Sequence, residues 1–465
     1  MLVGSEIDRD LAADVPMNRL VQGEVGSGKT LGARRARLAG AVRGGQSARL
    51  APTEVLAGQH LRSIVRSLGP DLAAELRPVL LTGQMSTAER RKATLAVVSG
   101  QSRIVVGTHA LISDAVEFWD LGLVVVDEQH RFGVEQREAL RRKGAAPPHV
   151  LVLTATPIPR TVAMTVFGDL DVSTITELPA GRQPIESFVV PLADRPGWAD
   201  RIWQRSAEEI AKGRQVFVVC PAIDAATVEQ GEPAAGAGGP EAGSTGSAAT
   251  DGTAGGAPPS PERASVEAVT ALARSLPVLA GARVEPLHGR MSADEKDDVM
   301  QRFARGEIDL LVATTVIEVG VDVPNASTMV VLDADRFGIS QLHQLRGRVG
   351  RGGHPGLCLL VTHAPVDSTA RERVDAVAAT LDGFELAQVD LELRREGDVL
   401  SSLQSGGRSS LRLLRVTTDG DLIGIAREHA AELLDADPSL GEHPALAAAI
   451  ARRLDDSSRD FMAAG

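Results

Sequence analysis

The sequence has few cysteines, few aromatic residues, no tyrosine and no excess of positive charge. The two cysteines, Cys220 and Cys358, have no second cysteine or histidine at metal-ligand spacing, which predicts two buried thiols and no zinc site. Aromatic residues make up 3% of the chain, which argues against a broad base-stacking platform for single-stranded nucleic acid. A net charge of −12 argues against binding to nucleic acid by bulk electrostatics, although it leaves room for a local basic track.

Long apolar runs are missing as well. No run reaches the ~18 residues that span a bilayer, and the N-terminus lacks a basic stretch followed by an apolar one. We therefore expect a cytoplasmic protein without a membrane partner. The length of 465 residues exceeds what one hydrophobic core usually serves, which predicts about two to four domains.

What is present is a repeated alternation of short apolar runs with helical stretches, the pattern of parallel sheets covered by helices. The first series of apolar runs comprises residues 19–22, 48–51, 79–81, 104–106, 123–126 and 150–153. The second series comprises residues 187–190, 216–219, 283–286, 310–312, 329–332 and 359–361. The sequence therefore predicts an α/β fold of two tandem domains with parallel sheets, followed by a mainly helical C-terminal region.

Changes in composition place the boundaries between these parts. Proline and glycine punctuate residues 177–184, which predicts a hinge after a first domain over residues 1–184. The strand pattern stops near residue 366, so we expect a second domain over residues 185–366 and a helical region over residues 367–465. Residues 229–265 contain no Val, Leu, Ile, Met, Phe or Trp, which predicts a disordered insertion in the second domain.

One octet matches the P-loop pattern, in which a strand turns through glycines into a helix whose N–H groups and dipole hold phosphate oxygens. It follows the strand-like residues 19–22 and consists of Gly23, Glu24, Val25, Gly26, Ser27, Gly28, Lys29 and Thr30. We expect Lys29 to reach the β- and γ-phosphates of ATP, and Thr30 to hold Mg²⁺. Because kinases, GTPases and transporters share the pattern, it predicts by itself only a nucleotide-binding protein.

A pair of carboxylates ends the apolar run at residues 123–126. Phosphate-bound Mg²⁺ lies at such strand ends in doubly wound sheets, so we expect Asp127 to order the metal through its water shell. Glu128 is expected to orient and deprotonate the attacking water, as phosphoryl transfer requires. The alternative is a solvated acidic strand end without a catalytic role.

Two arginines lie three residues apart in the segment from Gln344 to Arg351. We expect Arg348 and Arg351 to share one face of a helix and to stabilise charge in the transition state from the second domain. A solvated arginine-rich helix is the alternative. The neighbouring Gly347 favours a functional interpretation, because a glycine inside a helix costs about 1 kcal/mol relative to alanine.

Polar residues also follow several other strands of the first sheet, where ligands bind in this fold class. We predict that five residues at these strand ends contact the backbone phosphates of a nucleic-acid strand: Pro52, Thr53, Gly107, Thr108 and His109. The hydroxyls of Thr154 and Thr156 are expected to link the nucleotide pocket to the nucleic-acid face, with a helix cap as the alternative.

A comparable strand end in the second domain spans residues 313–324 and combines hydroxyls, a carboxylate and a glycine turn. It includes Thr314, Thr315 and Asp322, and we interpret it as a sensor of domain closure. An ordinary loop between a strand and a helix is the alternative.

In content and order, these motifs resemble those of superfamily 2 helicases over residues 17–366. They are, along the chain, GEVGSGKT, APTE, GTHAL, DEQH, TATP, LHGRM, ATTVIEVGVDVP and QLHQLRGRVGRG. Residues 127–137 and 156–161 look like RecG, a family of bacterial branched-DNA translocases, and the related Mfd proteins. Residues 383–387, 390–394 and 404–406 are similar to the translocation motif of these two families.

The resemblance implies two RecA-like domains that use ATP and Mg²⁺ to move along or unwind branched DNA, such as replication forks and Holliday junctions, in recombination and repair. It implies a catalytic role for Gln344 beside the arginines, a nucleotide contact for Asp322 and nucleic-acid contacts for Thr314 and Thr315. It also implies that Arg394 and Gln404 couple hydrolysis to movement. A monomer at the bacterial nucleoid, with a single-strand-binding protein as a partner, would be in keeping with the family.

Two features of that family have no counterpart in the sequence, namely an N-terminal wedge domain and an adenine-reading glutamine segment ahead of the P-loop. Residues 1–15 resemble the last helix before the first strand, so we expect a motor fragment, a truncated product or a relative without a wedge. Residues 395–402 depart from the usual translocation loop. Two functional alternatives stay open: an Mfd-like translocase acting on RNA polymerase, and a non-catalytic remnant that binds ATP or DNA.

Overall fold

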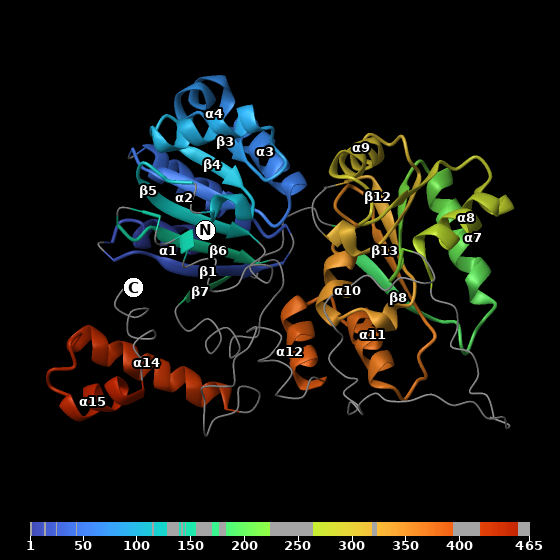
Figure 1. The fold of residues 1–465 in the computed structure, drawn as a ribbon. Coiled ribbons are helices and arrows are strands. Elements are labelled where there is room, and N and C mark those ends of the chain that lie inside the picture. Colours follow the sequence, from blue (N-terminus) through green and yellow to red (C-terminus); the bar gives the residue numbers. More distant parts are fainter. Residues whose placement is uncertain are drawn as a thin grey trace, which may run out of the picture. The chain divides into compact units, whose positions relative to one another are not determined.

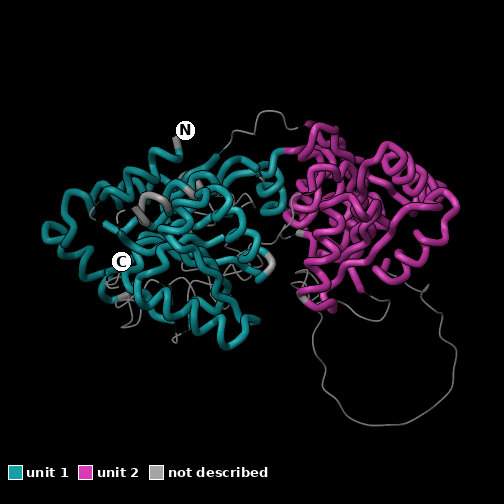
Figure 2. The backbone as a smooth tube through the Cα atoms, turned by 90° about the horizontal axis from the view of Figure 1, so that it is seen from above, with its two compact units in different colours: residues 1–180, 382–465 teal, residues 181–381 magenta. Residues whose placement is uncertain are grey.

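The structure is a computed structural model, and it describes residues 2–13, 15–24, 26–42, 44–113, 116–127, 139–140, 143–144, 146–154, 170–175, 183–223, 264–318, 323–393 and 419–453. The chain is organised in two compact units, which Figure 2 shows in different colours. Unit 1 comprises residues 1–180 and 382–465, and unit 2 comprises residues 181–381. The division into three domains at residues 184 and 366 stays a prediction.

Unit 1 is built on a parallel sheet of seven strands in the order β3-β4-β2-β5-β6-β1-β7 (Figure 1). The strands are β1 (Asn18–Gly23), β2 (Gln46–Leu50), β3 (Val79–Leu81), β4 (Ile104–Gly107), β5 (Leu121–Asp127), β6 (His149–Thr154) and β7 (Asp171–Ile175). In register, Leu20 of β1 lies opposite Val152 of β6 on one side and Val172 of β7 on the other. Because all strands are parallel, the segments that follow them begin at one edge of the sheet.

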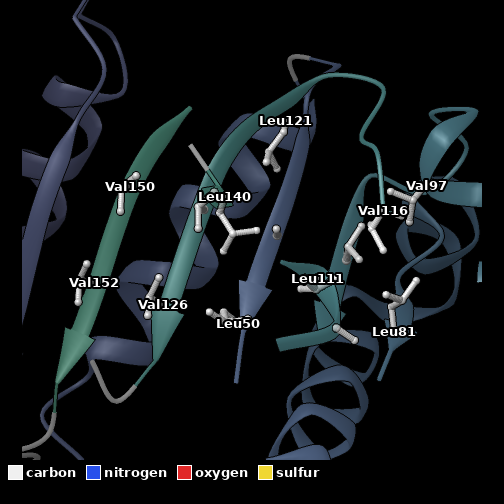
Figure 3. Close-up of a cluster of buried hydrophobic side chains, with 14 of the residues drawn as sticks. Leu50, Leu81, Val97, Leu111, Val116, Leu121, Val126, Leu140, Val150 and Val152 are labelled. Atoms are coloured by element: carbon white, nitrogen blue, oxygen red, sulfur yellow. The ribbon is translucent and has the colours of Figure 1, made fainter. Parts of the chain in front are cut away.

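Helices cover both faces of this sheet, and consecutive strand residues are therefore buried on opposite sides. The helices of unit 1 are α1 (Leu2–Asp10), α2 (Lys29–Val42), α3 (Glu54–Leu76), α4 (Thr87–Val98), the 3₁₀ helix η1 (His109–Leu111), α12 (Gly383–Leu393), α14 (Gly420–Ala436) and α15 (Pro444–Arg453). Val126 of β5 packs in one cluster with Val97 of α4 and Leu391 of α12, and Figure 3 shows most of this cluster. Val125 packs in a second cluster with Ile7 of α1.

Unit 2 has a parallel sheet of six strands in the order β10-β11-β9-β12-β13-β8. The strands are β8 (Ile185–Pro191), β9 (Gln215–Val219), β10 (Val284–Leu287), β11 (Leu310–Ala313), β12 (Ala326–Val331) and β13 (Gly356–Thr362). The helices are α7 (Trp198–Ala211), α8 (Val266–Ser275), η3 (Pro277–Leu279), α9 (Ala293–Ala304), η4 (Thr315–Glu318), η5 (Ala334–Arg336), α10 (Ile339–Arg346) and α11 (Thr369–Ala379). Val218 packs with Trp203 of α7 and Val269 of α8, whereas the ring of Phe217 lies 4.8 Å from that of Phe303 in α9.

The two sheets repeat the same local devices. Helix α4 follows the edge strand β3 and begins with a capping box of Ser86 and Glu89, and α9 follows the edge strand β10 with a capping box of Ser292 and Glu295. In each box the serine hydroxyl accepts from the glutamate N–H, and the glutamate side chain accepts from the serine N–H. These boxes fix where the two helices begin.

The predicted fold class is confirmed: two parallel sheets with helical coverings are followed by helices near the C-terminus. Every predicted strand is present, and β7 is a strand that the sequence did not predict. Cys220 and Cys358 are buried and unpaired with each other, as predicted, and burial raises the pKa of the Cys358 thiol to about 12. None of the described helices is long and apolar enough to cross a membrane.

The proposed insertion at residues 229–265 lies outside the described residues up to 263. Its last two residues are placed: Ala264 donates its N–H to Asp333 Oδ2 at 3.0 Å, and the Ser265 hydroxyl caps α8. The predicted insertion therefore extends two residues too far toward the C-terminus.

Candidate nucleotide-binding site and strand-end motifs

The P-loop joins the carboxyl end of β1 to α2, whose first residue is Lys29. Gly26 and Gly28 have φ angles of 87° and 96°, a region that L-residues with a side chain rarely adopt. A Cβ atom on Gly23 would lie 2.8 Å from the Ile175 carbonyl oxygen and equally near Ser27 Oγ. The three glycines are therefore required by the course of the backbone.

The side chains of this loop suit a bound phosphate. Lys29 Nζ donates to the carbonyl oxygens of Gly23 and Glu24 at 2.5 and 2.8 Å, so the ammonium group lies over the loop. Ser27 Oγ is buried and has no hydrogen-bond partner among the described residues. A cationic group, a hydroxyl without a partner and the N-terminus of α2 together form a cradle for an anion.

The carboxylate that ends β5 is held by two basic side chains. Asp127 Oδ2 accepts a hydrogen bond from Arg49 Nη2, whose side chain in β2 is 1% exposed. His60 Nε2, from α3, lies 3.1 Å from the same oxygen. Sequence reasoning missed both partners. The signals available were an arginine inside a buried strand, which needs a counter-ion, and a histidine on the helix that follows it.

Charge explains the protonation of this cluster. Burial raises the pKa of Asp127, but the Arg49 guanidinium and the hydrogen bond from His60 outweigh it and hold that pKa well below its ordinary value. Burial lowers the pKa of His60, and its hydrogen bond to Asp127 only partly offsets the effect. At neutral pH the cluster therefore consists of a carboxylate, a guanidinium and a neutral imidazole.

Two buried threonine hydroxyls occupy equivalent places in the two units. Thr108 follows β4 and Thr314 follows β11, and each of these strands is second from the edge of its sheet. Thr108 is 2% exposed and Thr314 is 1% exposed. Neither Oγ1 atom has a hydrogen-bond partner among the described residues. Buried hydroxyls normally find a partner, so both positions point to a bound ligand or solvent.

The remaining predicted nucleic-acid contacts lie at the carboxyl ends of β2, β4 and β11. Thr53 caps α3 by accepting from the Leu56 N–H at 3.3 Å, and Pro52 precedes it. His109 is exposed and begins η1, and Thr315 begins η4. Gly107 ends β4, and a Cβ atom there would lie 2.2 Å from the Leu81 carbonyl oxygen. Their contacts with nucleic acid stay predictions.

The arginine segment departs from its predicted conformation. Helix α10 ends at Arg346, with Gly347 as its C-cap, so Arg348 and Arg351 lie beyond the helix and do not share one of its faces. Gly350 has a φ of 69°, and a Cβ atom on Gly352 would lie 2.2 Å from the Pro324 carbonyl oxygen. The helix prediction was wrong because these glycines form a turn.

Arg346, in the same segment, was given no role by the sequence, but it makes several contacts in the structure. Its buried guanidinium donates to the carbonyl oxygens of Val377 and Thr380 at 2.5 and 2.6 Å and lies 2.8 Å from His343 Nδ1. Arg346 thereby fastens the C-terminal end of α11 to α10. Gln344 lies on α10 one residue after His343, and Arg351 Nε donates to the Gly347 carbonyl. The catalytic roles of Gln344, Arg348 and Arg351 stay predictions.

Several of the predicted site residues lie outside the described part of the chain. Thr154 is described: it ends β6 and is buried. Thr156, which was predicted to act with it, is not described. The side chain of Thr30 also lies outside the description, although its backbone is in α2. The predicted site residues that lie outside the described part of the chain are Val25, Glu128, Thr156, Asp322, Arg394 and Gln404.

Comparison with known proteins gives three family matches along the chain. The DEAD/DEAH box helicase family matches residues 9–165, and the helicase conserved C-terminal domain matches residues 260–353. The C-terminal part of domain 3 of the ATP-dependent DNA helicase RecG matches residues 380–460. The three matches follow one another in the order that the motifs predict.

Individual relatives agree with these matches. RecG from Mycobacterium leprae is 51% identical over 97% of this chain and 59% of its own length, and RecG from Mycobacterium tuberculosis is 52% identical over 91% and 55%. A structure of RecG bound to a three-way DNA junction is 36% identical, with a TM-score of 0.64 over 91% of this chain and 49% of that one. A structure of S. cerevisiae Dbp5 bound to RNA, at 16% identity and a TM-score of 0.55, shares the fold.

The chain thus spans between about half and three fifths of the length of these relatives. Within that span, both helicase domains and the part specific to RecG are matched. The chain therefore belongs to the RecG family of ATP-dependent DNA helicases.

Proposed function

We propose that this chain hydrolyses ATP and couples the hydrolysis to movement along branched or duplex DNA, in recombination and repair. The observation that carries this proposal is the P-loop, where Lys29, the N-terminus of α2 and the Ser27 hydroxyl, which has no partner among the described residues, form a cradle for an anion. Relatives at 51% and 52% identity bear the name ATP-dependent DNA helicase RecG. One of the similar structures holds a three-way DNA junction, which supports branched DNA as the substrate.

In the hydrolytic step, Lys29 exchanges its two carbonyl contacts for the β- and γ-phosphates, since a phosphate oxygen is the stronger acceptor for an ammonium group. Thr30 and Asp127 are the residues that would hold Mg²⁺, an ion that keeps several waters and needs few protein ligands. When bound, the ion neutralises charge that develops on the phosphates. Glu128 is the proposed base for the attacking water.

The DNA strand is proposed to run along the carboxyl ends of the sheets. Among the described residues, the hydroxyls of Thr108 and Thr314 have no partner, and they lie at equivalent strand ends of the two units. Hydroxyls are common donors to phosphate. Contacts with backbone phosphates carry little sequence information, which suits a protein that moves along DNA. A monomeric state, a nucleoid location and a single-strand-binding protein as partner complete the proposal.

The test is steady-state ATP hydrolysis by the purified chain, without DNA and with a synthetic three-way junction. The junction should raise the rate of ATP hydrolysis by wild type. The rate of Lys29→Ala should be at least about 100-fold lower than that of wild type, because the variant lacks the cation that stabilises negative charge on the transferred phosphoryl group. Lys143→Ala is the matched control, since Lys143 Nζ also donates to two carbonyls, those of Ser113 and Val116. Equal rates in Lys29→Ala and wild type would contradict the proposal.

A further inference from the structure

Helix α12 is fastened to the P-loop. The backbone N–H of Gly383, the first residue of α12, donates to Glu24 Oε1 at 2.8 Å across 359 positions of sequence. The next two N–H groups of the helix, from Phe384 and Glu385, donate to Asp382 Oδ1 at 2.8 and 3.4 Å. Three N–H groups at the start of α12 are therefore satisfied by carboxylates, and one of these carboxylates comes from the P-loop.

Glu24 is engaged through its backbone as well as its side chain. Its carbonyl oxygen accepts from Lys29 Nζ at 2.8 Å, while its carboxylate accepts from α12. Lys29 is the residue proposed to bind the phosphates of ATP. Glu24 therefore makes both contacts. Its carbonyl holds Lys29, which bound phosphates would draw away, and its carboxylate holds the first residue of α12.

The rest of α12 is anchored in unit 1. Leu386 and Leu391 are buried, and Leu391 belongs to the cluster that also contains Val126 and Val150 of the central strands. A change at the first residue of α12 therefore acts on a helix that is packed against the sheet.

On the other side, the connection to α12 is held by the arginine segment. Arg346 donates to the Val377 and Thr380 carbonyls within unit 2, and the chain enters unit 1 at Asp382. Between the Thr380 carbonyl and the Gly383 N–H, the backbone passes from a contact with α10 to a contact with the P-loop. Both ends of this short connection are thus bound by segments predicted to act on ATP.

We propose that Glu24 is a positioning residue that holds the start of α12 while the P-loop is empty and releases it when ATP binds. The inference rests on the proposed function and adds the path by which the nucleotide acts on α12. Phosphates draw Lys29 away from the Glu24 carbonyl and bring negative charge to the loop that carries the Glu24 carboxylate. The departure of Lys29 frees the loop to shift, and repulsion from the phosphates moves the Glu24 carboxylate away from the Gly383 N–H.

The test uses the full chain with Gly383→Pro, which removes the donor N–H at a helix position that tolerates proline, and Gly383→Ala, which keeps it. Hydrogen exchange of the peptide covering α12 is measured with and without a non-hydrolysable ATP analogue. In wild type and Gly383→Ala, we expect the analogue to accelerate exchange roughly tenfold, the size expected for losing one charge-assisted hydrogen bond. In Gly383→Pro, fast exchange should be present without the analogue and should not rise further.

A second pair of variants tests the acceptor. Glu24→Gln keeps an acceptor oxygen and should retain most of the protection of α12, whereas Glu24→Ala should behave like Gly383→Pro. Equal exchange in Gly383→Pro and Gly383→Ala would overturn the contact. Exchange of α12 in wild type that stays the same when the analogue is bound would overturn the release.

Binding of a fluorescent ATP analogue is measured in parallel. If it fails, the proposed function fails, while the comparison of the two Gly383 variants still decides whether the contact exists.

Discussion

At the scale of single residues, the ion pair between Arg49 and Asp127 is the most consequential interaction of the described site. Arg49 is almost completely buried in β2, and its Nη2 group contacts the carboxylate that ends β5. A buried guanidinium is tolerated only when it is paired, and removing one partner leaves the other charged and desolvated. The pair therefore fixes the position of the carboxylate that is proposed to order Mg²⁺.

Replacing Arg49 with methionine should lower the free energy of unfolding of unit 1 by about 3–5 kcal/mol, because Asp127 loses its counter-ion. Asp127→Asn in the same chain should restore part of this loss, since no buried charge remains. Urea unfolding followed by Trp119 fluorescence, with Trp198 and Trp203 replaced by Phe, measures the change in unit 1.

Arg35→Met is the control, because Arg35 pairs with Asp8 at the surface and should change stability by less than about 1 kcal/mol. Additive effects of Arg49→Met and Asp127→Asn would contradict this account.

Residue-level prediction from sequence succeeded where a motif fixes the backbone. The P-loop glycines were predicted by their spacing, and their φ angles show why other residues do not fit. Arg49 and His60 were missed because they belong to other segments, and only the pairing of β2 with β5 brings them to Asp127. Spacing along the chain carries no information about that neighbour.

At the scale of elements, a buried glutamine begins the corresponding strand of each unit, the third strand in the order of its sheet. Gln46 begins β2, and its Nε2 donates to the Val97 and Ser102 carbonyls at 2.9 and 2.7 Å. Gln215 begins β9, and its Nε2 donates to the Phe303 and Ile308 carbonyls at 2.6 and 2.7 Å. Each glutamine ties its strand to the end of the helix beside it and to the segment before the neighbouring strand.

Gln46→Leu should destabilise unit 1, and Gln215→Leu unit 2, by about 2–3 kcal/mol each, because buried carbonyls lose their donors. Trp119 lies in unit 1, whereas Trp198 and Trp203 lie in unit 2, so urea unfolding with one set of tryptophans replaced reports on each unit separately. Gln301→Leu, on the exposed side of α9, serves as the control. If either buried variant shifted the transition of the other unit by as much as its own, the separation into two units would be wrong.

Elements were predictable in proportion to their apolar content. The apolar run at residues 123–126, for example, became β5, a central strand that is almost wholly buried. β7 (Asp171–Ile175) was missed because its five residues, Asp-Val-Ser-Thr-Ile, contain no apolar run, and only Ser173 among them is buried. The arginine segment was predicted as helix because Arg348 and Arg351 lie three residues apart, whereas Gly347 caps the end of α10 and Gly350 lies in the turn after it.

At the scale of the whole molecule, the chain leaves unit 1 after residue 180 and returns to it at residue 382. After the return, Leu391 of α12 enters the core of unit 1, and Arg427 of α14 donates to the Leu170 carbonyl at 3.0 Å. The sequence predicted a helical tail, but periodicity describes each helix by itself and does not say which sheet it covers. The return of the tail to unit 1 required the structure.

The central claim is that one chain converts ATP hydrolysis into movement along DNA. The most direct measurement is displacement of a third strand annealed to duplex DNA downstream of a three-way junction, with wild type and Lys29→Ala. We expect release of the third strand by wild type with ATP, and none with a non-hydrolysable analogue or with Lys29→Ala. ATP hydrolysis that the junction stimulates without any release of the third strand would contradict the claim.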